Sequence, residues 1–162
     1  MNQHITPHNG PAPGELGRAC ACYNMRRASR ALTRLYDAWL APSGLKATQF
    51  SLLAAARSQG ELTVSRLAEI MATERTTLTR NLKLLEERGL VSTAPGRDKR
   101  EHLVRITKAG QAALLAALPY WEKAQTAMEE RFGKERLAEF ITGLRELTEA
   151  AGEAPAQPEE DA

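Results

Sequence analysis

Apolar side chains recur at helical spacing along most of this chain, and they alternate in one short region only. A stripe with an apolar residue at every third or fourth position runs from 14 to about 41, before the Pro-Ser-Gly run at 42–44. Further stripes predict a helix over 108–132, which Pro119 is expected to kink, and a last helix to about residue 150. The pattern predicts a mainly α-helical chain.

The middle of the chain follows a different order. Thr63 and Thr73 are expected to cap a short helix and a second helix rich in Thr and Arg, which ends before Gly89. Residues 90–94 and 101–106 then alternate like two strands, and the basic run between them predicts a hairpin. Helix, tight turn, helix and hairpin form a winged helix-turn-helix, which places its second helix in the major groove of DNA.

These elements define the fold class that we expect, mainly α with a small β-wing. The expected parts are a flexible N-terminal arm (1–13), one domain (14–150) with a DNA-binding core (45–110) and dimerisation helices (14–41 and 108–150), and an acidic disordered tail (151–162). A three-helix core with a wing needs little more apolar surface to fold. The outer helices are therefore expected to pack against each other and against a second subunit, giving a homodimer. The alternative is that they complete a monomeric core.

Charge is distributed unevenly, although the net charge is only +2. The last twelve residues carry four acids and no base, so residues 1–150 carry +6. Residues 73–108 hold nine basic and five acidic side chains. This basic excess is compatible with double-stranded DNA as the partner, and a solvated charged surface is the alternative.

Other functions find little support in the sequence. The longest apolar runs, such as 112–118, are too short for a membrane span, and the N-terminus is not a secretory signal, so no membrane is expected and the location is expected to be cytoplasmic. No nucleophile triad, phosphate-binding loop or pair of catalytic carboxylates stands at a suggestive position, which argues against an enzyme. No cofactor is expected. No metal is expected either, because the two cysteines lack a histidine at usable spacing.

The segment from the helix pair to the hairpin closely resembles the MarR family of winged-helix transcriptional regulators. The residues that carry the resemblance are an Asp-x-Arg in the wing and a later Ile-Thr with Gly three residues on: Asp98, Arg100, Ile106, Thr107 and Gly110. The order of elements is similar over about residues 15–150. The resemblance implies a triangular homodimer that usually represses transcription and often responds to a small molecule or an oxidant.

The second helix of the pair supplies the candidates for reading DNA. Arg75 and Thr77 are expected to contact bases, because the matching positions of the family face the groove and because Arg pairs with guanine. Thr76, Thr79 and Arg80 are expected to hold phosphates, and pairing of Arg80 with a nearby acid is the alternative. In the wing, Arg100 resembles the family arginine of the minor groove, and we expect Asp98 to hold a nearby arginine. The candidate DNA-binding residues are Arg75, Thr76, Thr77, Thr79, Arg80, Arg97, Asp98, Lys99 and Arg100.

Cys22 is a candidate redox sensor. Aligned with the organic-peroxide-sensing branch of the family, Cys22 falls on the reactive cysteine and Tyr36 on one of the tyrosines that contact it. Two further tyrosine positions fall on Ala47 and Arg26, so the resemblance is incomplete. An inert core cysteine is the main alternative, and pocket lining or a metal contact are others. A disulfide to Cys20 is not expected, because helical positions two apart point about 200° away from each other.

A pocket for a small-molecule effector is expected between the dimerisation helices and the DNA-binding core. Its candidate walls are Tyr36, Trp39, Phe50 and Trp121, which core packing would explain equally well. The function that we expect is a sequence-specific repressor acting as a homodimer on a pseudo-palindromic operator, released by a small molecule or an oxidant. A winged-helix module that binds an acidic protein partner is the alternative.

Overall fold

The computed structural model describes residues 13–96, 98 and 101–152. Most of them are helical, with one small sheet, so the fold class predicted from the sequence is confirmed. The predicted arm (to residue 12) and most of the predicted tail (from 153) lie outside the described residues. In chain order, the elements are α1 (Pro13–Ala19), α2 (Ala21–Leu40), η1 (Ala41–Ser43), α3 (Ala47–Gln59), β1 (Leu62–Thr63), α4 (Val64–Ile70), α5 (Arg75–Glu87), β2 (Val91–Pro95), β3 (His102–Ile106), α6 (Lys108–Phe132) and α7 (Lys134–Gly152).

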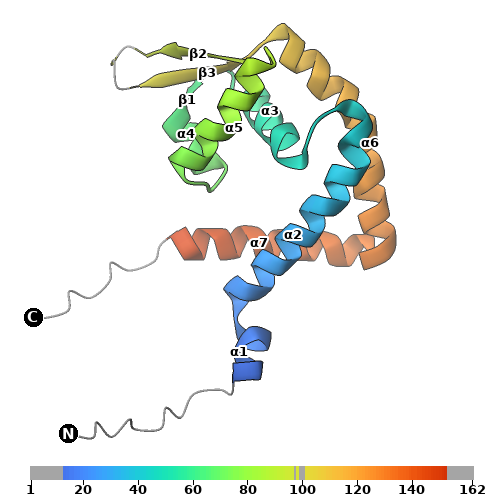
Figure 1. Ribbon diagram of the computed structural model, residues 1–162. Coiled ribbons are helices and arrows are strands. Elements are labelled where there is room, and N and C mark those ends of the chain that lie inside the picture. The colour runs from blue at the N-terminus through green and yellow to red at the C-terminus, as the bar shows by residue number, and fades with distance from the viewer. Residues whose placement is uncertain (1–12, 97, 99–100, 153–162) are drawn as a thin grey trace, which may run out of the picture.

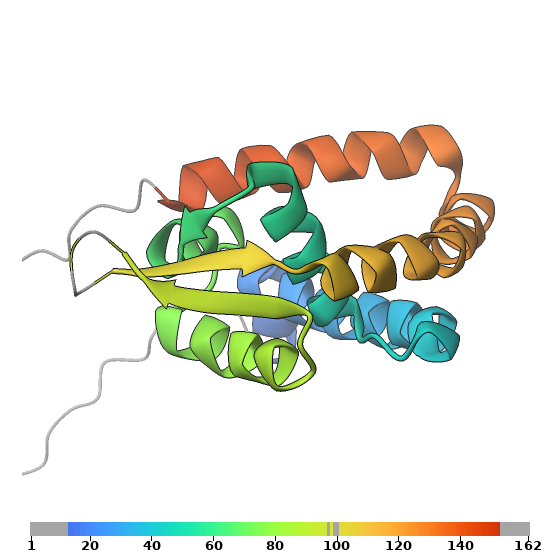
Figure 2. The same cartoon turned by 90° about the horizontal axis from the view of Figure 1, so that it is seen from above.

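The elements form a compact lobe and a set of long outer helices. Helices α3, α4 and α5 gather beside the sheet, and the β2–β3 hairpin projects from this lobe (Figure 1). Helix α6 leads away from the lobe, packs against α2 and α3, and turns back into α7. Seen from above, α5 and α7 lie on opposite sides of the molecule (Figure 2). Every helix of the described residues is too short or too polar to cross a bilayer.

The sheet contains one strand that the sequence did not predict. Its order is β1-β3-β2, antiparallel throughout, with Val91 opposite Ile106 and Leu62 opposite Val104. Strand β1 has only two residues, which is too short for an alternating pattern to mark it. It joins the end of α3 to the far side of β3, and so fixes the hairpin to the helices of the lobe.

The hydrophobic core lies in the lobe and under the first half of α6. Leu53, Leu67, Leu85 and Val104 are among its completely buried side chains. Helix α7 contributes little to it, since it buries only the side chain of Leu137, whereas α6 buries Leu114 and Ala117. The homodimer and the alternative of a monomeric core both stay predictions.

The first predicted helix is interrupted at Cys20, and its expected continuity was wrong. Cys20 has extended backbone angles, and its Sγ accepts a hydrogen bond from the backbone N–H of Tyr23 at 3.4 Å. The side-chain amide of Asn24 lies 2.9–3.1 Å from the carbonyl oxygens of Gly17, Arg18 and Cys20. These contacts satisfy the helix end that an interruption leaves open. Because cysteine is not among the usual N-caps, no residue pattern marks this interruption.

Several predicted caps are present, and one is displaced. The hydroxyl of Thr63 accepts from the N–H of Arg66 at 3.1 Å, and Gly89 has a φ of +68°. Thr73, the expected cap of α5, lies one residue too early, because Glu74 takes that position. The turn before it uses Ala72 at a φ of +45°, in the left-handed region.

Candidate nucleic-acid interface

Helix α5 presents one apolar and one polar face. Leu78, Leu82 and Leu85 are at most 3% exposed and hold the helix against the lobe. The side chains of the opposite face are exposed, and they include five of the predicted DNA-binding residues: Arg75, Thr76, Thr77, Thr79 and Arg80. The structure therefore brings these five together on the solvent side of one helix.

Neither arginine of this face is paired with an acid of the described residues. The ion pairs between described residues include neither Arg75 nor Arg80, so the alternative of an Arg80 ion pair is not observed. Arg75 occupies the first turn, where free backbone N–H groups also favour an anion. The Thr79 hydroxyl donates to the carbonyl of Arg75 at 2.8 Å, which leaves its oxygen as an acceptor only. The hydrogen-bonding role of Thr79 toward a phosphate is correspondingly restricted.

The wing is a hairpin built on β2 and β3. Where the strands meet the loop, the N–H of Gly96 donates to the carbonyl of Glu101 at 2.8 Å, and the N–H of Glu101 donates to that of Asp98 at 2.9 Å. Arg97, Lys99 and Arg100 lie outside the described residues. Their expected contacts with DNA, and the role of Asp98 in holding one of them, stay predictions.

A carboxylate that the sequence analysis did not single out ties the wing to α5. One oxygen of Glu86 accepts both the backbone N–H of Thr93 at 3.0 Å and its hydroxyl at 2.6 Å. Glu86 lies in the last turn of α5 and Thr93 in the middle of β2. The contact therefore fixes the angle between the helix and the hairpin. It had no signal in the sequence, because an acid near a helix end usually faces only water.

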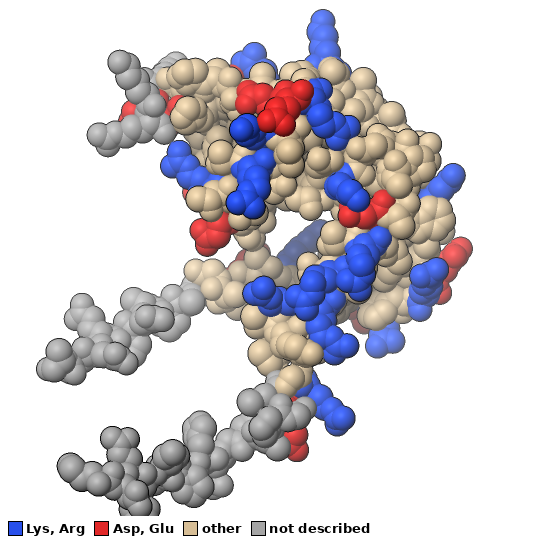
Figure 3. Space-filling model, viewed as in Figure 1, with Lys and Arg blue, Asp and Glu red and all other residues tan. Residues whose placement is uncertain are grey.

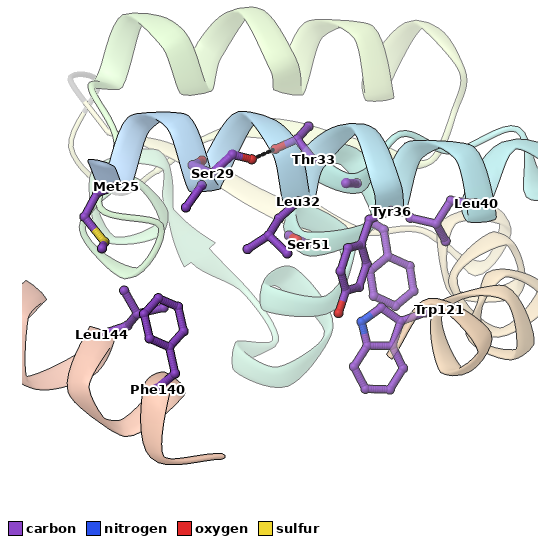
Figure 4. A pocket seen from close by; sticks show the side chains of 13 residues that line it. Met25, Ser29, Leu32, Thr33, Tyr36, Leu40, Ser51, Trp121, Phe140 and Leu144 are labelled. Carbon is purple, nitrogen blue, oxygen red and sulfur yellow. Dashed lines mark hydrogen bonds between the residues drawn. The ribbon is translucent and has the colours of Figure 1, made fainter. Parts of the chain in front are cut away.

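A cavity of about 410 Å³ lies between α2, α3, α6 and α7 (Figure 4). Tyr36, Phe50 and Trp121 line it, and the rings of Phe50 and Trp121 stack with centroids 6.1 Å apart. The Tyr36 hydroxyl donates to the side-chain carbonyl of Gln125 at 2.7 Å. Trp39 does not line this cavity, and its side chain is 38% exposed. Three of the four residues expected around a pocket are thus neighbours, and the fourth lies apart.

Tyr36 is the titratable group that this environment perturbs. Burial of its ring raises the pKa of the phenol above the ordinary value of 10.0, and the nearby charge of Glu129 raises this pKa further. The phenol therefore stays neutral at ordinary pH and serves as a hydrogen-bond donor in the cavity wall.

The two cysteines are free and exposed where α1 meets α2. Exposure of Cys22 does not fit its interpretation as an inert core residue, whereas its role as a redox sensor stays a prediction. His102 lies exposed on β3. Within the described residues, no three His, Cys, Asp or Glu side chains gather in a way that could hold a metal ion.

This chain is similar to a family model, to a curated protein and to several solved structures. A family model described as the MarR family matches residues 43–101. The HTH-type transcriptional regulator YwoH of Bacillus subtilis is 31% identical over 118 residues, which are 73% of this chain and 80% of YwoH. The M. tuberculosis transcriptional regulator MosR, solved in complex with DNA, has 42% identity and a TM-score of 0.71 over 82% of this chain and 98% of that chain. A mutant MarR from E. coli complexed with operator DNA shares the fold at 24% identity, with a TM-score of 0.70 over 82% of this chain and 93% of that chain.

Proposed function

This chain belongs to the MarR family of transcriptional regulators, and we propose that it is a sequence-specific repressor that binds a pseudo-palindromic operator as a homodimer. The observation that carries this proposal is the polar face of α5, where two unpaired arginines and three threonines face solvent together. The arginine donors of such a helix complement the acceptor atoms that guanine presents in the major groove, and a threonine hydroxyl can donate or accept there. The DNA-bound form of the 42% identical MosR supports the same partner.

Within this interface we assign different roles to the side chains. Arg75 and Thr77 contact bases, whereas Thr76 and Arg80 contact phosphates. Thr79 contacts a phosphate only when its hydroxyl leaves the carbonyl of Arg75. The wing residues Arg97, Lys99 and Arg100 approach the adjacent minor groove, with Arg100 inserted. Base contacts give the sequence preference, while phosphate contacts fix the register of the protein on the duplex.

The homodimer is supported by apolar side chains that the single chain leaves exposed on its outer helices. Leu115 on α6 is 49% exposed, and Leu147 on α7 is 43% exposed. A second copy that covers these helices would bury this surface, and its two-fold symmetry would place two α5 helices on one side of a duplex.

We further propose that a chemical effector releases the DNA. The cavity lined by Tyr36, Phe50 and Trp121 is mostly apolar, with one phenol as a polar anchor, which suits a small aromatic molecule. It lies beside α2 and α6, the helices that join the lobe to the proposed dimer interface. A ligand there could change the spacing of two α5 helices. If the effector is an oxidant and not a ligand of the cavity, the exposed thiol of Cys22 is the candidate site of its reaction.

The proposal is tested by selection of genomic fragments with the purified, reduced protein at about 150 mM salt, followed by sequencing of the retained DNA. A recurring pseudo-palindrome with half-sites about one helical turn apart is the expected result. Retention without a shared sequence would mean non-specific binding. No retention would favour the alternative of a protein-interaction module. Either of the last two results overturns the proposed function.

A further inference from the structure

Helix α2 carries a row of arginines outside the winged helix-turn-helix. Arg26, Arg27, Arg30 and Arg34 are all exposed, and at 100° per residue they fall within about 100° of arc on one face of the helix. The only acid of α2 is Asp37, and it is engaged elsewhere. Its carboxylate accepts from the N–H of Ala47 at 2.7 Å and lies 3.6 Å from the amine of Lys46. We call these four arginines the α2 arginine row.

Within the described part of the chain, no acidic side chain forms an ion pair with this row. The guanidinium of Arg27 makes a cation–π contact, 5.6 Å from the centre of the exposed Tyr23 ring. Like charges three or four residues apart destabilise a helix, so the row costs stability unless an anion covers it.

The α2 arginine row is continuous with the proposed DNA-reading surface. Arg26 lines a hollow together with Thr73, Glu74 and Thr77, at the turn before α5 and its first turn. The carboxylate of Glu69 in that hollow is already paired with Arg66 at 2.9 Å. Lys and Arg side chains appear over α2 and over the α4–α5 region on the same face of the molecule (Figure 3). Figure 2 places α7 on the side away from α5.

From this placement we infer that the α2 arginine row is a second DNA-binding surface, which contacts the phosphate backbone beyond the bases read by α5. The inference rests on the proposed function. A duplex held by α5 approaches from the face that the row shares, and its phosphates supply anions for arginines that have no ion pair among the described residues. Arginine suits this role because its guanidinium donates in pairs to phosphate oxygens. Such contacts add affinity and salt dependence without adding sequence preference.

The test is the salt dependence of DNA binding for the full chain with Arg30→Gln and with the triple variant Arg27→Gln/Arg30→Gln/Arg34→Gln. Affinity for the selected operator duplex is measured at several salt concentrations, alongside a scrambled duplex. Each phosphate contact contributes about 0.9 to the slope of log K against log salt concentration. We expect Arg30→Gln to lower this slope by about 0.9 for each chain bound, and the triple variant to lower it further. The preference for each base of the operator should not change.

The control is Arg145→Gln, which removes an exposed arginine from α7, on the side away from α5. It should leave the slope unchanged. If Arg30→Gln and the triple variant also keep the wild-type slope, the inference is overturned while the proposed function stands. If the wild-type protein has no preference for the operator over the scrambled duplex, the proposed function itself fails.

The oligomeric state in solution distinguishes DNA binding by the row from a contact of the row with a second copy of the chain. If the row instead meets acidic side chains of a second copy, the variants should lower the molar mass in solution, and this result overturns the inference. A variant that keeps the wild-type mass and melting temperature but loses salt dependence supports it. Should the triple variant fail to fold, Arg30→Gln alone decides.

Discussion

A Cβ atom added to Gly110 would lie only 1.9 Å from the carbonyl oxygen of Leu90. The first turn of α6 therefore rests directly on the backbone that follows α5. Thr107 strengthens this junction, because its hydroxyl donates to the carbonyl of Gly89 at 2.7 Å and its backbone N–H donates to that of Leu90 at 3.1 Å. The outer helix and the helix proposed to read DNA are thus joined backbone to backbone, which suits the transmission of a shift from one to the other.

Gly110→Ala should destabilise the protein for this reason. Neither partner can move aside easily, since the clash is with backbone, and overpacking of this kind costs about 1–3 kcal/mol of unfolding free energy. Urea denaturation measures the change. Gly143→Ala in α7 is the control, because nothing lies within 4 Å of the added atom, and it should stabilise the helix by about 0.4–1 kcal/mol. Equal stabilities of the two variants would contradict the close contact.

Arg75→Ala should weaken operator binding by about 1–3 kcal/mol and relax the preference at one base pair. The expected cause is loss of a bidentate contact with a guanine edge. Binding to a set of single-base operator variants measures it. Arg80→Ala is the comparison, and it should weaken binding to every sequence alike, as loss of a phosphate contact does. If Arg75→Ala behaved in the same uniform way, its assignment as a base-reading residue would be wrong.

Glu86→Ala should lower operator affinity relative to Glu87→Ala. Both variants remove one negative charge from the last turn of α5, but only Glu86 binds Thr93 in the wing. If the lost hydrogen bonds are worth about 1 kcal/mol, the affinity of Glu86→Ala falls about fivefold below that of Glu87→Ala. Titration of a labelled operator compares the two variants. Identical affinities would show that the wing does not depend on this anchor.

Tyr36→Phe should reduce the fall in unfolding free energy that the protein shows at high pH. The folded-state pKa of Tyr36 is raised, so its contribution to stability is fully present below the unfolded value of 10.0 and is lost as the pH rises through the folded value. Unfolding free energies at about pH 9 and about pH 11 measure this loss. Tyr23→Phe, which removes an exposed phenol and leaves the Tyr36 contact intact, is the control. The same loss in wild type and Tyr36→Phe would contradict the prediction.

Sequence patterns were most informative where a regular element buries one face. The leucines of α5 and the full length of α6 were predicted correctly, because helical periodicity is a local property of the chain. Gly89 marked the end of α5, since a positive φ there favours glycine. The polar face of α5 followed from the same periodicity.

Features set by tertiary contacts were not predictable in the same way. The interruption at Cys20 depends on a thiol cap and on Asn24, neither of which is a common signal. Trp39 is a large aromatic residue of the kind that often lines a pocket, and only the packing of the helices shows that it lies outside the cavity. The Glu86–Thr93 contact joins a helix to a strand, and no local pattern encodes that distance. The α2 arginine row was visible as residues, but its relation to α5 required the fold.

Recognition of a particular DNA sequence is what the proposed function requires of this chain, and a competition experiment tests it. The affinity for the selected operator duplex is compared with that for a scrambled duplex of equal length and composition, at about 150 mM salt. We expect the operator to be bound at least about 10³-fold more tightly. Equal affinities for the two duplexes would contradict it.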